Sequence, residues 1–177
     1  GRTWRSQADK GCALSTVVES VPTDNGFEVT MLDPQTLDRF KARFALEKDR
    51  PEIIVEVSGE GPLGTALDYP APFKTQPGDR LVYPHNEGMG FPVEEKHPIG
   101  DTYQAWCGSG LCVAFFGVVE DATGAGWMTI LETEADASMR TRRDADGCIS
   151  AGPSWDPQLG QFGGVRKARY VMLDKGG

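Results

Sequence analysis

Residues 115–133, FFGVVEDATGAGWMTILET, decide the fold class of this chain. The segments 111–120 and 127–133 are rich in aromatic and β-branched residues, which favour strands. The DATGAG sequence between them has the Asp and Gly residues of a tight turn. A third run, 101–106, precedes Gly108-Ser109-Gly110, another turn sequence. We therefore expect a meander of three consecutive antiparallel strands.

Short strands separated by turns are expected along the rest of the chain as well. Residues 39–47 alternate apolar and polar side chains with a period of two, which favours a strand, although their composition also suits a helix. The polar run 133–147, TEADASMRTRRDADG, is interpreted as an exposed loop. The other expected strands are 26–32, 52–58, 80–83, 148–155 and 166–174. The pattern predicts an all-β fold, an antiparallel two-sheet β-sandwich, formed by residues 1–177 as a single domain.

Composition excludes several classes of partner. The chain has 177 residues and a net charge of −8, so a nucleic acid or an anionic membrane is not expected to bind it. No run of about 18 apolar residues is present, and none is expected to span a bilayer. A neutral ligand such as a carbohydrate is compatible with this charge.

The four cysteines predict neither a disulfide scaffold nor a metal centre. Cys107 and Cys112 flank the Gly-Ser-Gly turn, where they are either a disulfide across a hairpin or two reduced thiols; we favour the thiols. A zinc site needs a tighter group of ligands, which His85 and His97 do not supply. No metal and no cofactor is predicted.

Residues 79–95, DRLVYPHNEGMGFPVEE, concentrate the polar chemistry of the chain. Tyr83, His85, Asn86 and Glu87 are candidate substrate-binding residues, followed by an expected Met-Gly-Phe-Pro turn. A histidine beside a carboxylate can transfer protons at neutral pH, but the same pair in a turn is commonly a solvated hydrogen-bonding group. The sequence offers no complete catalytic cleft, so no catalytic residue is assigned.

A second group of candidates lies in the glycine-rich segment GPSWDPQLGQFGG. Trp155 is placed there in an irregular loop, where it would either stack against a sugar or fill the core. Gln158 and Arg166 could bond sugar hydroxyls or contact a neighbouring domain. Trp127, by contrast, is expected in the core.

Known catalytic motifs do not help to assign a reaction. The sequence has no Gly-x-Ser-x-Gly elbow, phosphate-binding loop or His-Glu-x-x-His motif. Glycosidases use a pair of carboxylates. With 26 acidic residues in the chain, a pair close in sequence proves nothing.

The order of motifs after Asp79 resembles a known architecture. The motifs that carry the resemblance are, in order, PGDRLVYPHNEGMGFPV, FFGVVEDATGAGWMTILET and SWDPQLGQFGGVRKARYVMLDKGG, which ends in Asp-Lys-Gly-Gly. Their order resembles that in the N-terminal β-sandwich of large bacterial glycoside hydrolases, including those similar to endo-α-N-acetylgalactosaminidases. The resemblance covers residues 79–177. It implies a galactose-mutarotase-like supersandwich that precedes a catalytic (β/α) barrel.

The resemblance implies an accessory function. The expected function is that of a non-catalytic domain that packs on the barrel of the same parent chain and lends loop residues to the sugar pocket. An autonomous carbohydrate-binding module and a mutarotase-like enzyme using His85 and Glu87 are the alternatives. The resemblance also implies a secreted or periplasmic protein.

Overall fold

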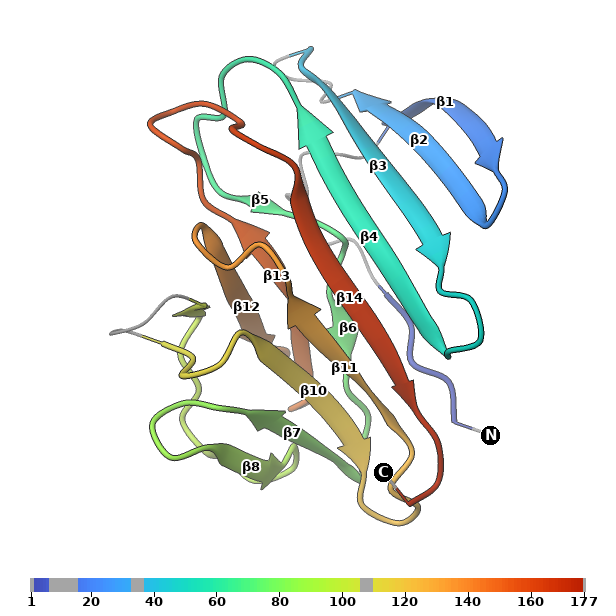
Figure 1. The fold of residues 1–177 in the computed structure, drawn as a ribbon. Helices are drawn as coiled ribbons and strands as arrows, with labels where there is room; N and C mark the ends of the chain where they lie inside the picture. The colour runs from blue at the N-terminus through green and yellow to red at the C-terminus, as the bar shows by residue number, and fades with distance from the viewer. Residues whose placement is uncertain (1, 7–15, 33–36, 106–109, 177) are drawn as a thin grey trace.

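The computed structural model describes residues 2–6, 16–32, 37–105 and 110–176, and every regular element among them is a β-strand (Figure 1). Nine strands form one antiparallel sheet, in the spatial order β1 (Thr16–Thr23), β2 (Gly26–Leu32), β3 (Arg39–Leu46), β4 (Glu52–Gly59), β14 (Arg166–Leu173), β11 (Gly126–Leu131), β10 (Phe115–Glu120), β7 (Asp79–Tyr83) and β8 (Met89–Pro92).

The second sheet is smaller and lies behind the first in Figure 1. Its path is β5 (Leu67–Asp68), β13 (Ile149–Trp155), β12 (Ala137–Arg143) and β9 (Thr102–Gln104), with β6 (Phe73–Lys74) also paired to β13. The predicted all-β sandwich of two antiparallel sheets is thus confirmed. No described segment forms a helix that is long and apolar enough to cross a membrane.

Residues 115–133 form a hairpin at the centre of the large sheet. Phe115 pairs with Ile130 and Gly117 with Met128, and β10 also pairs with β7 through Gly117 and Val82. Alternate residues of these strands point toward the small sheet. Trp127 is one of them and is 2% exposed, which confirms its predicted place in the core.

The core fills the space between the two sheets. Because both inner faces are apolar, their burial supplies the main stabilisation of the sandwich. Its largest fully buried apolar side chains are Trp127, Trp155, Tyr83, Phe116, Phe162, Leu81, Leu111, Leu131, Met139 and Ile149.

Several expectations about individual segments were wrong. The run 133–147 is not an exposed loop, because it contains β12, whose Ala137 and Met139 are fully buried. The expected meander is also wrong, because β9 pairs with β12 in the small sheet and not with β10. Met89–Pro92 is strand β8 rather than a turn, and Trp155 ends strand β13 rather than lying in a loop.

Candidate functional site

The first group of candidate residues lies in the hairpin between β7 and β8. The connection is tight: His85 N donates to Tyr83 O (3.0 Å), and Gly88 N donates to His85 O (2.9 Å). Asn86 and Gly88 adopt positive φ angles of 54° and 99°, which asparagine and glycine tolerate better than most residues. The turn chemistry of the sequence therefore fixes the conformation of this loop.

Tyr83 supports the loop from the core. Its side chain is 1% exposed, and its ring centroid lies 4.9 Å from that of Tyr103. The two hydroxyl oxygens are 3.4 Å apart, and Gly100 N donates to the hydroxyl of Tyr103 (2.7 Å). Burial raises the pKa of Tyr83, and the contact with Tyr103 raises it further. Tyr83 is therefore a neutral phenol at any physiological pH.

His85 is held in one orientation by the neighbouring chain. Its Nδ1 lies 2.9 Å from Gly110 O, and because a carbonyl only accepts, Nδ1 carries the proton and donates. The ring also packs against Tyr103, with centroids 5.2 Å apart. This leaves Nε2 as the nitrogen that can accept a proton. Asn86 and Glu87 follow at the exposed tip of the loop.

A shallow cavity of about 260 Å³ adjoins this hairpin. Val82, Tyr83, Pro84, Gly88, Met89, Gly90 and Phe115 line it. His85 and Glu87 are not among the lining residues, so the cavity does not join them into an acid–base site. Its lining suits an apolar side chain or the apolar face of a ligand.

Cys112 also contacts the loop. Its N donates to Pro84 O (2.7 Å), and its Sγ donates to Asn86 O (2.9 Å). Cys112 is a free thiol in the structure, whereas its suggested disulfide partner, Cys107, lies outside the described residues. Among the residues that the structure describes, no group of three or more His, Cys, Asp or Glu side chains is placed to hold a metal ion.

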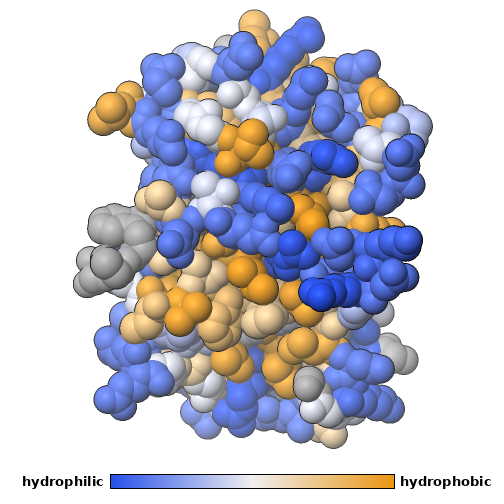
Figure 2. All heavy atoms as spheres, in the orientation of Figure 1, coloured by the Kyte–Doolittle hydropathy of each residue, from blue (hydrophilic) through white to orange (hydrophobic). Residues whose placement is uncertain are grey.

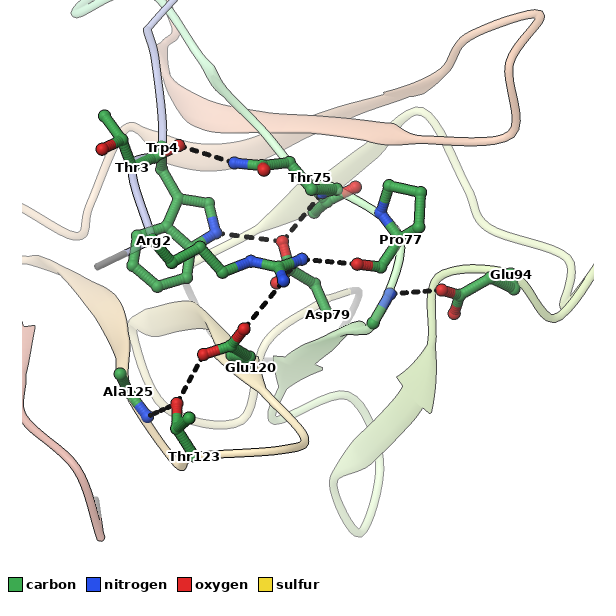
Figure 3. Close-up of polar contacts among 12 residues, drawn as sticks. Arg2, Thr3, Trp4, Thr75, Pro77, Asp79, Glu94, Glu120, Thr123 and Ala125 are labelled. Carbon is green, nitrogen blue, oxygen red and sulfur yellow. Dashed lines mark hydrogen bonds and ion pairs between the residues drawn. The ribbon is translucent and has the colours of Figure 1, made fainter.

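The start of β7 is an electrostatic cluster that sequence reasoning missed (Figure 3). Asp79 is fully buried, and its Oδ2 accepts hydrogen bonds from Trp4 Nε1 (2.9 Å) and Gln76 N (2.8 Å). Arg2 pairs with Asp79 Oδ1 (2.9 Å) and with Glu120 (2.8 Å). Burial raises the pKa of Asp79, while these hydrogen bonds and Arg2 oppose the rise. The cluster fastens residues 2–6 to the sandwich.

The second group of candidates lies where β13 leads into β14. Trp155 is fully buried, and its Nε1 donates to Tyr69 O (2.6 Å). It has no exposed face for a sugar, which counts against an aromatic platform at this residue. Gln158 is exposed, but its Nε2 donates to Asp136 Oδ2 (3.0 Å).

Arg166 is bound within the protein. Its Nη2 lies 2.7 Å from Asp136 Oδ2 and donates to Asp156 O (2.8 Å), its Nη1 donates to Phe162 O, and its Cζ lies 4.6 Å from the centroid of the Phe162 ring. Burial lowers the pKa of Arg166, and Asp136 opposes this shift. The side chain therefore stabilises the β13–β14 connection.

The predicted residues form two groups rather than one pocket. Strands β11 and β10 lie between β14 and β7 in the large sheet, so the spacing of about 4.8 Å between neighbouring strands separates β14 from β7 by roughly 14 Å. Whether Tyr83, His85, Asn86 or Glu87 contacts a sugar stays a prediction. A sequence signal for the Asp79 cluster existed only in the Pro-Gly-Asp turn before β7.

Comparison with known proteins identifies the fold. No family model matches the chain, and no curated protein matches its sequence. Among solved structures, the α-N-acetylgalactosaminidase NagBb of Bifidobacterium bifidum, ligand-free, is similar with a TM-score of 0.79 and 20% identity, over 98% of this chain and 32% of that chain. Its GalNAc complex gives a TM-score of 0.76 at 20% identity, over 92% and 28% of the two chains.

A second enzyme shares the architecture more distantly. The GH36 α-galactosidase AgaA of Geobacillus stearothermophilus is similar with a TM-score of 0.53 and 12% identity, over 99% of this chain and 28% of that chain. The chain thus spans about a third of the length of these enzymes. At such identities the likeness establishes a shared fold: the chain has the fold of a β-sandwich segment present in these two enzymes.

Proposed function

We propose that this chain is the non-catalytic accessory β-sandwich domain of a longer glycoside hydrolase, and that it packs on the catalytic barrel of that parent chain. One observation carries the proposal: the likeness to NagBb spans 98% of this chain but only 32% of the enzyme. The rest of such an enzyme has the length to hold a separate catalytic domain, and a (β/α) barrel of about 250 residues is a common one.

The carboxylates of the candidate site support a non-catalytic role. A glycosidase needs an acid and a second carboxylate facing one sugar, about 5–5.5 Å or 6.5–9.5 Å apart. Asp79 is buried against Trp4 and Arg2, and Glu120 is bonded to Arg2. Glu94 accepts from Gly78 N, and Glu87 stands at an exposed loop tip. Three of these four groups thus serve the fold.

The hairpin loop is the part of the domain proposed to border the sugar pocket. Asn86 and Glu87 are exposed, and the backbone beneath them is fixed by hydrogen bonds, so they would meet a ligand without reordering. A carbohydrate is therefore the proposed small-molecule partner, bound together with residues of the barrel.

The proposal is tested by comparing this chain with its parent. An aryl α-N-acetylgalactosaminide or aryl α-galactoside is incubated with each. We expect turnover by the parent and none by the 177-residue chain. In the parent, Asn86→Ala is expected to raise KM with little change in kcat, because a loop at the pocket wall contributes to binding. Turnover by the isolated chain would overturn the proposal.

A further inference from the structure

One row of residues on the outer face of the large sheet runs from β8 to β14 without a charge. The register places Gly90, Val82, Gly117, Met128 and Val171 side by side on β8, β7, β10, β11 and β14. Val82, Met128 and Val171 point outward, because their chain neighbours Leu81, Trp127 and Tyr170 are buried between the sheets. Gly90 and Gly117, which both pair with Val82, present backbone without a side chain on the same face.

The rows on either side extend this apolar surface. Phe115 and Ile130 pair on one side, where Arg169 on β14 continues the row, and Val119, Gly126 and Leu173 lie on the other, where Arg80 on β7 continues it. Figure 2 shows apolar residues gathered over β7, β10 and β11 on this face. We call the ten uncharged residues of these three rows the outer patch. The sequence carries the same signal, because FFGVV and, apart from the buried Thr129, WMTIL lack polar side chains on both faces, whereas a strand with one face in water alternates.

The other half of the same face carries charged side chains, as a solvent-exposed surface does. Cross-strand ion pairs cover it, with Lys41 3.3 Å from Glu28 and Arg43 3.7 Å from Glu56. Arg169 lies 2.6 Å from both Glu52 and Glu132. One sheet face thus carries two different surfaces, and only the charged half has the alternation of a solvated strand. Contiguous apolar surface rimmed by polar residues is typical of an interface.

The occupant of the outer patch follows from its chemistry and its position. The ten residues of the outer patch carry no charge, and the arginines Arg80 and Arg169 stand at its edge. On a protein of net charge −8 this matches a permanent, apolar contact rather than a steered encounter. The cavity of about 260 Å³ between Val82, Gly90 and Phe115 has the size and lining to receive an aliphatic or aromatic side chain. Beyond β14, Gly176 N donates to Thr123 O (3.1 Å) in the β10–β11 turn, which places Gly176 beside this patch.

We infer that the outer patch is the surface on which the catalytic domain of the parent hydrolase packs, with an apolar side chain of that domain inserted into the cavity at Gly90. The inference rests on the proposed function and deepens it, because it names the face that is covered. It also explains the place of the β7–β8 hairpin, whose exposed loop would then lie at the rim of the domain interface.

Cysteine labelling tests the inference in the parent and in the isolated chain. Gly90→Cys places a thiol in the outer patch, where an added Cβ meets only ordinary contacts, 3.7 Å from Arg80 Cδ and 3.8 Å from Val82 Cγ2. Lys41→Cys is the matched control in the charged half. A maleimide is added, and modification at each residue is read by peptide mass spectrometry. We expect Cys at 41 to react in both proteins, and Cys at 90 to react at least tenfold more slowly in the parent.

The outcomes separate the inference from the proposed function. Equal labelling of position 90 in both proteins would refute the packing face while leaving the accessory role intact. A parent gene that encodes no further domain would refute both. A concentration-dependent dimer of the isolated chain, protected at position 90 and dissociated by Gly90→Arg, would assign the patch to a second copy and overturn the inference.

Discussion

Asp136→Ala is the substitution whose effect follows most directly from the structure. The Asp136 carboxylate lies 2.7 Å from the guanidinium of Arg166, whose side chain is 1% exposed, and it also accepts from Gln158. Alanine leaves Arg166 charged and buried, with the carbonyls of Phe162, Gly164 and Asp156 as its remaining acceptors. Removing one partner of a buried pair typically costs about 3–5 kcal/mol.

A loss of this size is a large part of the total stability. Domains are commonly stable by about 5–15 kcal/mol, so the midpoint of urea unfolding should fall markedly. For a chain of this length the loss corresponds to a decrease in Tm of roughly 6–20 °C. Circular dichroism during urea and thermal unfolding measures both quantities.

A second ion pair provides the matched control. Arg80 and Asp121 are 2.8 Å apart, but their side chains are 37% and 41% exposed. Asp121→Ala should therefore cost about 0–1 kcal/mol. The double variant Arg166→Met with Asp136→Leu should be more stable than Asp136→Ala, because no unpaired charge stays buried. Equal losses in Asp136→Ala and Asp121→Ala would refute the assignment of Arg166 to the core of this connection.

Three further predictions address the other candidate residues. Trp155→Ala should lower the free energy of unfolding by about 3–5 kcal/mol. Trp155→Phe should leave any sugar affinity measured by calorimetry unchanged. Weaker sugar binding by Trp155→Phe at an unchanged Tm would contradict the burial of Trp155. Arg2→Gln should destabilise by about 1–3 kcal/mol at pH 7, and less near pH 4. Burial raises the pKa of Asp79 in the folded protein. The stability that its protonated form contributes is therefore fully present below the pKa that Asp79 has in the unfolded chain, and it is lost as pH rises through the pKa that Asp79 has in the folded protein. Without Arg2 the loss of stability between pH 4 and pH 7 is larger. If urea unfolding gave the same effect of Arg2→Gln at both pH values, the pairing of Arg2 with Asp79 would be refuted. The chain should not accelerate anomer interconversion in polarimetry, since His85 and Glu87 share no cavity; an acceleration abolished by Glu87→Gln would favour the mutarotase-like alternative.

The central strands could be predicted because their local signals agree with the fold. The turn DATGAG joins β10 and β11 as expected, and the β-branched run of residues 52–58 lies within β4. Strand β1 was missed because seven of its eight residues are exposed, so no apolar alternation marks it. Strand β12 was missed because the outward-pointing Arg140 and Arg142 alternate with the buried Met139 and Thr141. The many charged residues of this segment concealed the alternation of buried and exposed side chains.

Contacts between residues far apart in the chain could not be predicted from the sequence. Turn residues predict that two consecutive strands pair as a hairpin, but they do not reveal that β9 belongs to the small sheet. Likewise, Arg166 and Asp136 are 30 positions apart, and Arg2 and Asp79 are 77 apart, so neither pair has a local signature. The candidate hairpin was found because its chemistry is contiguous in sequence. The second group was misjudged because its burial depends on residues far along the chain.

The backbone at Gly117 sets a rule for how this surface can vary among relatives. A Cβ built there would lie 2.7 Å from Trp127 O, so any side chain would push β10 from β11. We therefore expect position 117 to remain glycine in an alignment of homologues. Positions 82, 128 and 171 can exchange among apolar residues, and the packing proposed above predicts that they do so in step with positions of the catalytic domain. Columns 82, 128 and 171 that change together with columns of the catalytic domain would be the record of a shared interface, whereas an invariant column 117 would record only the contact between β10 and β11.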